Sequence, residues 1–242
     1  MKARNLGKTH PLTPTPLSLS AGEMSFWDKI LHGEIWWNSQ ENSPRGGIAV
    51  TTLTSPSSRS VLAGPRPLRW TCAEFHRFGD MGVFEGRRAM LIDGVILEQG
   101  PMNPPHAITL GLVEEAIRTA VGAGWWLRQQ SPLVLGQDTD PEPDLAVVPG
   151  HPRDYAGHPT TADLVVEVVD SSLDFDTNEK RLLYARAGIR DYWVVDINGR
   201  RLLVYRNPQA GDFASQQVLG PADSVAALAA PAAAVRVADL LV

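Results

Sequence analysis

The sequence predicts one globular domain of the α/β (α+β) class. The chain has 242 residues, 43% of them hydrophobic, which is enough to bury a core of ordinary size. Leu164 to Val169 is apolar on both faces except at Glu167, as expected for a central strand that is covered on both sides. Ile108 and Leu112 begin an apolar stripe with helical spacing. A sheet with helices packed against it follows from these observations.

The chain divides into three segments by composition. Residues 1–66 are rich in Pro, Ser, Thr and Gly, so we expect them to be disordered. Residues 67–206 hold the predicted domain, and residues 207–242 form a C-terminal extension with Val235 to Leu241 as a candidate last strand. No run reaches the roughly 18 apolar residues of a membrane span, and the start does not resemble a secretory signal. We therefore expect a cytoplasmic protein without a membrane partner.

Charge and cysteine content exclude several classes of site. Cys72 is the sole cysteine, which excludes an internal disulfide framework and a cysteine-clustered zinc site, and we expect it to be a buried thiol. Residues 67–206 carry 14 basic and 20 acidic side chains. A tight, non-specific DNA binder usually has a basic face, so this balance argues against that class. It does not exclude a site where metal ions offset clustered carboxylates.

The first half of the domain reads as a helix, a hairpin and a second helix. Thr71 to Glu74 forms a capping box for a short helix through Phe78. Asp93-Gly94 is a strong hairpin signal. The predicted hairpin strands are Ala89 to Asp93 and Val95 to Gln99, and the next helix follows Pro104-Pro105 and ends at Gly122 and Gly124.

The second half alternates strands with one helix. Asp176 to Glu179 reads as a second capping box, for a helix that runs to about Ala187 and stops at Gly188. Asn198-Gly199 predicts another hairpin. The predicted strands are Trp125 to Gln129, Leu145 to Val148, Leu164 to Val169, Tyr192 to Ile197 and Arg201 to Tyr205.

Lys180 is the only lysine after Lys29, in a chain whose later basic residues are otherwise arginines. At about 100° per residue it lies near the centre of the apolar arc of its helix, with Leu183, Tyr184 and Ala187. It should therefore point toward the sheet. An ammonium on a buried stripe is unfavourable unless it meets carboxylates or reaches water through a cleft.

Two acids on predicted strands are candidate partners for this lysine. Glu167 interrupts a strand of Leu and Val, where an unpaired charge would cost several kcal/mol. Asp144 stands at the start of the preceding strand, and adjacent strands would bring the two carboxylates together. Two hard oxygen ligands suit Mg²⁺ or Mn²⁺ better than zinc. The alternative is a structural Glu167–Lys180 ion pair beside an Asp144 that only begins a strand.

Six short motifs that occur in order along the chain resemble the Uma-two family of endonucleases, within the PD-(D/E)xK, restriction-endonuclease-like superfamily. The likeness runs from about Leu68 to Tyr205. The motifs are Pro143-Asp144, Val165 to Val168, Asp170 to Ser172, Asp176 to Lys180, Tyr184 to Ile189 and Asp191 to Asp196. The resemblance implies a restriction-endonuclease-like core around a mixed sheet.

The same resemblance implies roles for the three charged residues. Asp144 and Glu167 would bind the metal, and Lys180 would position the attacking water and steady the charged phosphate. The superfamily's usual lysine lies two residues after the second acid, and here that position is Val169. Relocation to the following helix agrees with the direction in which Lys180 is expected to point.

The expected activity is Mg²⁺- or Mn²⁺-dependent hydrolysis of phosphodiester bonds, with DNA as the substrate. Alternatives are a catalytically silent member of the fold that binds nucleic acid or protein, and a hydrolase of smaller phosphate esters. Cutting both strands of DNA calls for two sites, which a homodimer would supply.

Three further residues are candidate accessories. The resemblance places a histidine at His106, although this residue could equally cap or pack a helix. Glu98 could add a carboxylate but reads more simply as a solvent-facing charge. Asp176 reads as a helix cap that could also support Lys180.

Overall fold

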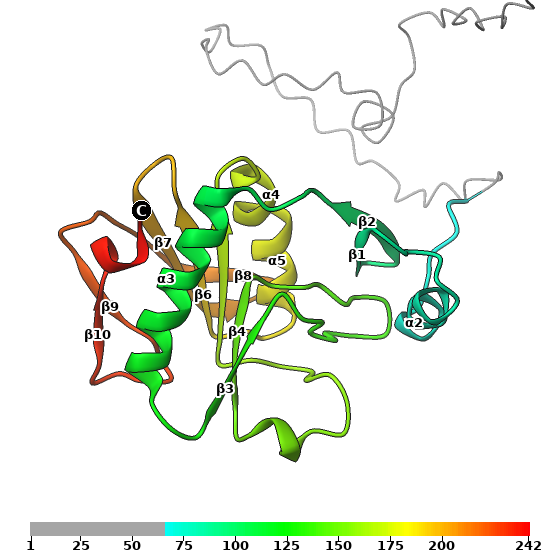
Figure 1. The fold of residues 1–242 in the computed structure, drawn as a ribbon, viewed down its shortest axis with the longest axis horizontal. Coiled ribbons are helices and arrows are strands. Elements are labelled where there is room, and N and C mark those ends of the chain that lie inside the picture. Colours follow the sequence, from blue (N-terminus) through cyan, green and yellow to red (C-terminus); the bar gives the residue numbers. More distant parts are fainter. Residues whose placement is uncertain (1–65) are drawn as a thin grey trace, which may run out of the picture. The chain divides into compact units, whose positions relative to one another are not determined.

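The computed structural model describes residues 66–242, so our expectation for residues 1–65 falls outside the described residues. A six-stranded sheet of order β3-β4-β5-β6-β7-β8 forms its centre (Figure 1). Neighbouring strands are antiparallel except β5 and β6, which are parallel. The strands are β3 (Trp125–Gln129), β4 (Leu145–Pro149), β5 (Leu164–Val169), β6 (Asp191–Asp196), β7 (Arg201–Gln209) and β8 (Asp212–Leu219). The predicted α+β class with a central mixed sheet is confirmed.

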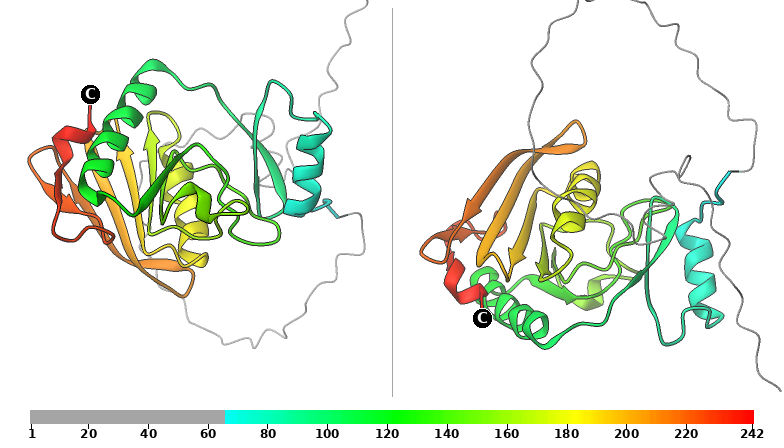
Figure 2. Two further views of the ribbon diagram at one scale, coloured as in Figure 1. Left: turned by 60° about the horizontal axis from the view of Figure 1, so that its bottom comes forward. Right: turned by 90° about the horizontal axis from the view of Figure 1, so that it is seen from above.

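Helices cover both faces of this sheet, as Figure 2 shows from above. One face packs against α3 (Pro104–Val121) and the C-terminal segment of β9 (Ser224–Ala226), β10 (Ala234–Arg236) and the 3₁₀ helix η2 (Val237–Leu240). The other face packs against α5 (Glu179–Arg186). Val166 and Val168 lie in the first core, whereas Val165 and Val169 lie in the second. Because strand side chains alternate, Glu167 shares the face that is turned toward α5.

A smaller layer precedes the sheet. It consists of α2 (Cys72–Asp80) and a hairpin of β1 (Arg88–Ile92) and β2 (Val95–Gln99), around a core that includes the buried, free Cys72. Both hydrogen bonds of the Thr71–Glu74 capping box are present. Asp93 and Gly94 have φ of 47° and 75°, which the two central residues of a type I′ turn require. The predicted capping box and hairpin are confirmed.

The Asp176–Glu179 capping box is wrong. A short helix α4 (Leu173–Thr177) comes first, and Asn178 separates it from α5. Asp176 lies inside α4, where the Ser172 hydroxyl donates to its carboxylate at 2.6 Å and Lys180 Nζ lies 3.0 Å from its other oxygen. The carboxylate is therefore held by side chains and caps no backbone N–H group of α5.

The C-terminal segment differs from our expectation in two ways. The β7–β8 hairpin crosses residue 206 and adds β8 to the sheet, so the sheet continues into residues 207–242. The candidate strand at Val235 to Leu241 forms only in part: β10 pairs with β9, and η2 follows at once.

Among residues 66–242, no helix is long and apolar enough to cross a membrane.

Candidate active site

Strand register brings Asp144 and Glu167 together. Leu145 of β4 faces Val166 of β5, so the residue before β4 lies beside Glu167. The backbone N–H of Asp144 donates to Glu167 Oε2 at 3.4 Å, and the N–H of Val168 donates to Asp144 Oδ2 at 2.9 Å. The two carboxylates thus meet at one end of the sheet, as the sequence predicts.

Asp144 is stabilised as an anion. His106 Nε2 and the Gln130 amide each donate to its Oδ1 at 3.2 Å. Burial alone would raise the pKa of Asp144, but the hydrogen bond and charge of His106, the Val168 N–H and Lys180 outweigh burial and lower it. Asp144 therefore presents a carboxylate at neutral pH.

The negative charge of Glu167 is less well compensated than that of Asp144. Three groups contact its carboxylate, and the first is the Asp144 N–H described above. The Tyr184 hydroxyl donates to Oε1 at 2.7 Å, and Lys180 Nζ lies 3.0 Å from the same oxygen. Burial, together with the nearby charges of Asp144 and Asp176, outweighs these partners and raises the pKa of Glu167 to about 8. Glu167 therefore holds its proton more tightly than an exposed glutamate does.

Lys180 points into the protein, as the position of this residue on the helix predicts. Its side chain is 9% exposed and lies between Glu167 Oε1 and Asp176 Oδ1, each 3.0 Å from Nζ. Burial would lower the pKa of Lys180, but the charges of Glu167, Asp176 and Asp144 raise it. The ammonium is therefore fixed, fully charged and aimed at the two acids.

One cavity of about 400 Å³ is lined by Asp144, Glu167 and Lys180, together with His106 and Asp176. Its walls come from the β1–β2 hairpin, the loop that follows β2, the start of α3 and the segment from Val168 to Lys180. Figure 1 shows the loop after β2 reaching the first turn of α3 near α4. Elements that are distant in the sequence thus enclose the end of the sheet where Asp144 and Glu167 meet.

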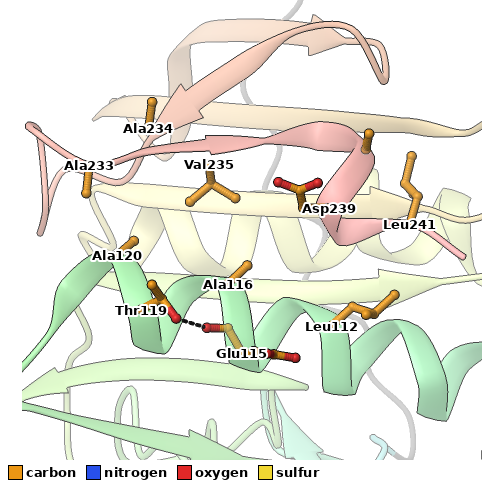
Figure 3. Close-up of a pocket in the computed structure, with 11 residues that line it drawn as sticks. Leu112, Glu115, Ala116, Thr119, Ala120, Ala233, Ala234, Val235, Asp239 and Leu241 are labelled. Atoms are coloured by element: carbon orange, nitrogen blue, oxygen red, sulfur yellow. Dashed lines mark hydrogen bonds between the residues drawn. The ribbon is translucent and has the colours of Figure 1, made fainter.

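A second hollow, of about 560 Å³, lies between α3 and the β10–η2 segment (Figure 3). Its walls are mostly small and apolar, with Glu115 and Asp239 as its charged side chains. Among the described residues that line it, none is a basic, histidine or cysteine side chain that could work with these acids. The smaller cavity, with its lysine, histidine and clustered acids, is therefore the candidate active site.

The three candidate accessory residues differ in placement. His106 is in the site: its pKa is raised by the hydrogen bond to Asp144, which outweighs partial burial, and its backbone N–H donates to the capping side chain of Asn103. Asp176 also belongs to the site, as the second carboxylate beside Lys180. Glu98 lines the cavity but is mostly exposed and lies 3.9 Å from Arg87. It therefore fits the solvent-facing interpretation.

Two residues of the site are absent from the prediction made on the sequence. Gln130 has a φ of 42°, uncommon for a side-chain-bearing residue, and its side chain contacts Asp144. Tyr184 is predicted only as part of an apolar arc, yet its hydroxyl holds Glu167. The sequence offers a signal for Tyr184, because a tyrosine that faces a buried acid is expected to donate a hydrogen bond to it. The sequence offers no signal for Gln130, whose place in the site depends on its backbone conformation.

Comparison with known proteins gives the family of the chain and supports its fold. Residues 72–238 match the model of the family Uma2, described as "Putative restriction endonuclease". The chain belongs to the Uma2 family. A crystal structure titled as a putative nuclease belonging to DUF820, from Anabaena variabilis ATCC 29413, has a TM-score of 0.53 and 19% identity, covering 63% of this chain and 88% of that chain. No curated protein matches the chain. The family supports a nuclease function, and the structural likeness supports the fold.

The residues of this Uma2 site are compatible with a divalent metal ion. Across residues 66–242, no group of three or more His, Cys, Asp or Glu side chains is arranged to hold a metal. Mg²⁺, however, is commonly bound by one or two carboxylates and keeps several waters. Asp144 and Glu167 supply two carboxylates, which meet at one end of the sheet. The donor set suits Mg²⁺ or Mn²⁺.

Replacing Tyr184 by Phe should destabilise this Uma2 domain by about 1–3 kcal/mol, since buried Glu167 would lose a donor. Urea unfolding with circular dichroism measures the effect. Tyr205→Phe is the matched control, because Tyr205 packs on the same face of the sheet but lines a separate hollow. Equal effects of the two changes would contradict a specific role for the Tyr184 hydroxyl.

Proposed function

We propose that this chain is a Mg²⁺- or Mn²⁺-dependent endonuclease that hydrolyses phosphodiester bonds in DNA. The observation that supports this most directly is the meeting of Asp144, Glu167 and Lys180, from three separate elements, in one cavity. Burying three ionisable side chains together is unfavourable unless they form ion pairs and hydrogen bonds or coordinate a metal ion. Membership of the Uma2 family agrees with a nuclease activity.

Asp144 and Glu167 would hold the metal ion. When bound, such an ion polarises a phosphoryl oxygen and lowers the pKa of its bound water. The Val168 N–H, His106 and Gln130 fix the Asp144 carboxylate, so that its direction is set before substrate arrives. Preorganised charges of this kind are the usual source of large rate enhancements.

Lys180 would stabilise negative charge that develops on the phosphate. An ammonium has three N–H donors. Nζ forms ion pairs with Glu167 and Asp176 and also lines the cavity, so an N–H group can donate to an oxygen of the substrate there. The two carboxylates therefore hold Lys180 in place and still allow it to contact substrate.

Asp144→Asn and Glu167→Gln should each reduce cleavage of DNA in the presence of Mg²⁺ or Mn²⁺ by at least about 100-fold, because each removes a charge from the proposed metal site. Gel assays of cleavage of single-stranded DNA and of plasmid DNA measure the loss. Glu98→Gln is the matched control, because Glu98 lines the same cavity without contacting either acid, and it should keep most activity. Cleavage by both amide variants at the wild-type rate would refute the assignment.

A second candidate is a catalytically silent member that binds nucleic acid or protein. The observation that favours it is the engagement of Lys180 by two carboxylates, which resembles a structural ion-pair network. Calorimetry with Mg²⁺ and Mn²⁺ separates the two functions. Binding that is lost in Asp144→Asn supports the nuclease, and no binding by the wild type supports the silent member.

A further inference from the structure

We propose that the cavity accommodates an unpaired nucleobase next to the scissile phosphate, so that the substrate is a single-stranded or locally unpaired segment of nucleic acid. This inference rests on the proposed function, because it concerns which polymer reaches the same acids. Three observations carry it: the burial of the charged groups, the apolar side chains that line the same cavity and the charge balance of the cavity.

The two acids of the proposed metal site are buried within the cavity. The side chains of Asp144 and Glu167 are 12% and 2% exposed. A cavity of about 400 Å³ is in the size range of pockets for small molecules, and a base-paired duplex cannot enter it whole. Enzymes that act on a buried atom of a nucleotide commonly bring that nucleotide out of the base stack. A separated strand could enter the cavity where a duplex could not.

Part of the cavity wall is apolar. Met90 and Leu97 of the hairpin, Met102 of the following loop and Phe175 of α4 line it together with the acids. A bare phosphate would gain nothing from such a wall, whereas a nucleobase stacks on aromatic rings and packs against adaptable methionines. The Phe175 ring centroid lies 5.8 Å from Lys180 Nζ, so a base against this wall would be adjacent to the charged groups.

The charge balance favours contact with few phosphates. Five acids line the cavity, against Arg88 and Lys180 as fixed cations and His106 as a third group that can be charged. Residues 67–242 as a whole carry 15 basic and 23 acidic side chains. Proteins that hold a duplex neutralise many phosphates with lysines and arginines. A site that binds one phosphate and one base needs far fewer.

The test uses oligonucleotides that carry the fluorescent base 2-aminopurine, whose emission falls when it stacks on an aromatic ring. Binding to the Asp144→Asn variant is measured for a single strand, for a duplex with an unpaired bulge, and for a fully paired duplex of the same sequence. We expect the first two to be quenched and to bind at least tenfold more tightly than the paired duplex. Cleavage by the wild type should show the same order of preference.

Two substitutions probe the wall itself. Phe175→Leu keeps the apolar volume but removes the ring, and it should weaken single-strand binding at least about fivefold and abolish quenching. Met102→Ala should weaken binding, whereas Met81→Ala, at an exposed methionine that follows α2 and does not line the cavity, should not. Circular dichroism verifies that each variant is folded.

The outcomes separate this inference from the proposed function. Equal binding and cleavage of paired and unpaired substrates, or a Phe175→Leu variant that still quenches, would overturn the base-binding cavity and leave metal-dependent cleavage standing. Quenching that depends on Phe175 without cleavage of any substrate would overturn the nuclease and leave the base-binding cavity. Failure of both measurements would overturn both.

Discussion

Replacing Lys180 by Met should lower the free energy of unfolding by about 3–5 kcal/mol and reduce cleavage by at least about 100-fold. The lysine is the cation that both Glu167 and Asp176 contact, at 3.0 Å each. Its removal would leave two buried carboxylates without that partner. Urea unfolding measures the first effect, and cleavage of single-stranded and plasmid DNA by protein that remains folded measures the second.

A triple variant tests the structural role of Lys180. Lys180→Met combined with Glu167→Gln and Asp176→Asn removes all three charges, so it should recover part of the lost stability, as when a buried ion network is replaced by neutral groups. Activity should not return, because Glu167→Gln removes a carboxylate of the proposed metal site as well. Arg190→Met removes one exposed positive charge and should change stability by less than about 0.5 kcal/mol. A stable Lys180→Met protein with normal cleavage would disprove both roles.

Glu167 and Lys180 could be predicted as site residues because each is a charged side chain at an apolar position of its element. Glu167 interrupts an apolar strand, and Lys180 lies on the apolar stripe of a helix, so simple burial arguments are enough to pair them. Asp144 then follows from strand adjacency, which the register of β4 and β5 confirms. Their joint placement is observed, whereas their catalytic roles remain predictions.

Features without an unusual burial pattern could not be predicted. Strand β8 is an edge strand with mostly exposed side chains, and Phe213 is its one buried residue, so it carries little hydrophobic signal. Asp176 fits the capping-box pattern, but its carboxylate contacts Ser172 and Lys180, four residues away on either side, and not the backbone of α5. The cavity wall made by the hairpin could not be predicted either, because it depends on how two layers pack and not on any one segment.

In metal-free protein, the free energy of unfolding should fall as the pH rises from about 5 to 8.5. Glu167 has a pKa raised from 4.5 to about 8 in the folded state, so the folded protein holds this proton more tightly than the unfolded chain does. A group whose pKa is raised by folding stabilises the fold fully below its unfolded pKa, and that contribution is lost as the pH rises through its folded pKa. The slope from this one group is at most about 1.4 kcal/mol per pH unit. The raised pKa of His106 acts in the same direction.

A divalent cation should reverse this trend, because it favours the ionised form of Glu167 in the same pocket. Addition of Mg²⁺ should therefore raise Tm more at pH 8 than at pH 6, and binding at pH 7 should release close to one proton. Thermal unfolding at both pH values measures the first effect, and calorimetry in buffers with different ionisation enthalpies counts the proton. In Glu167→Gln the pH slope should flatten and the proton release should disappear. If that variant responds to Mg²⁺ and pH as the wild type does, Glu167 is not the group that couples the metal to the fold, and the buried acids serve only to anchor Lys180.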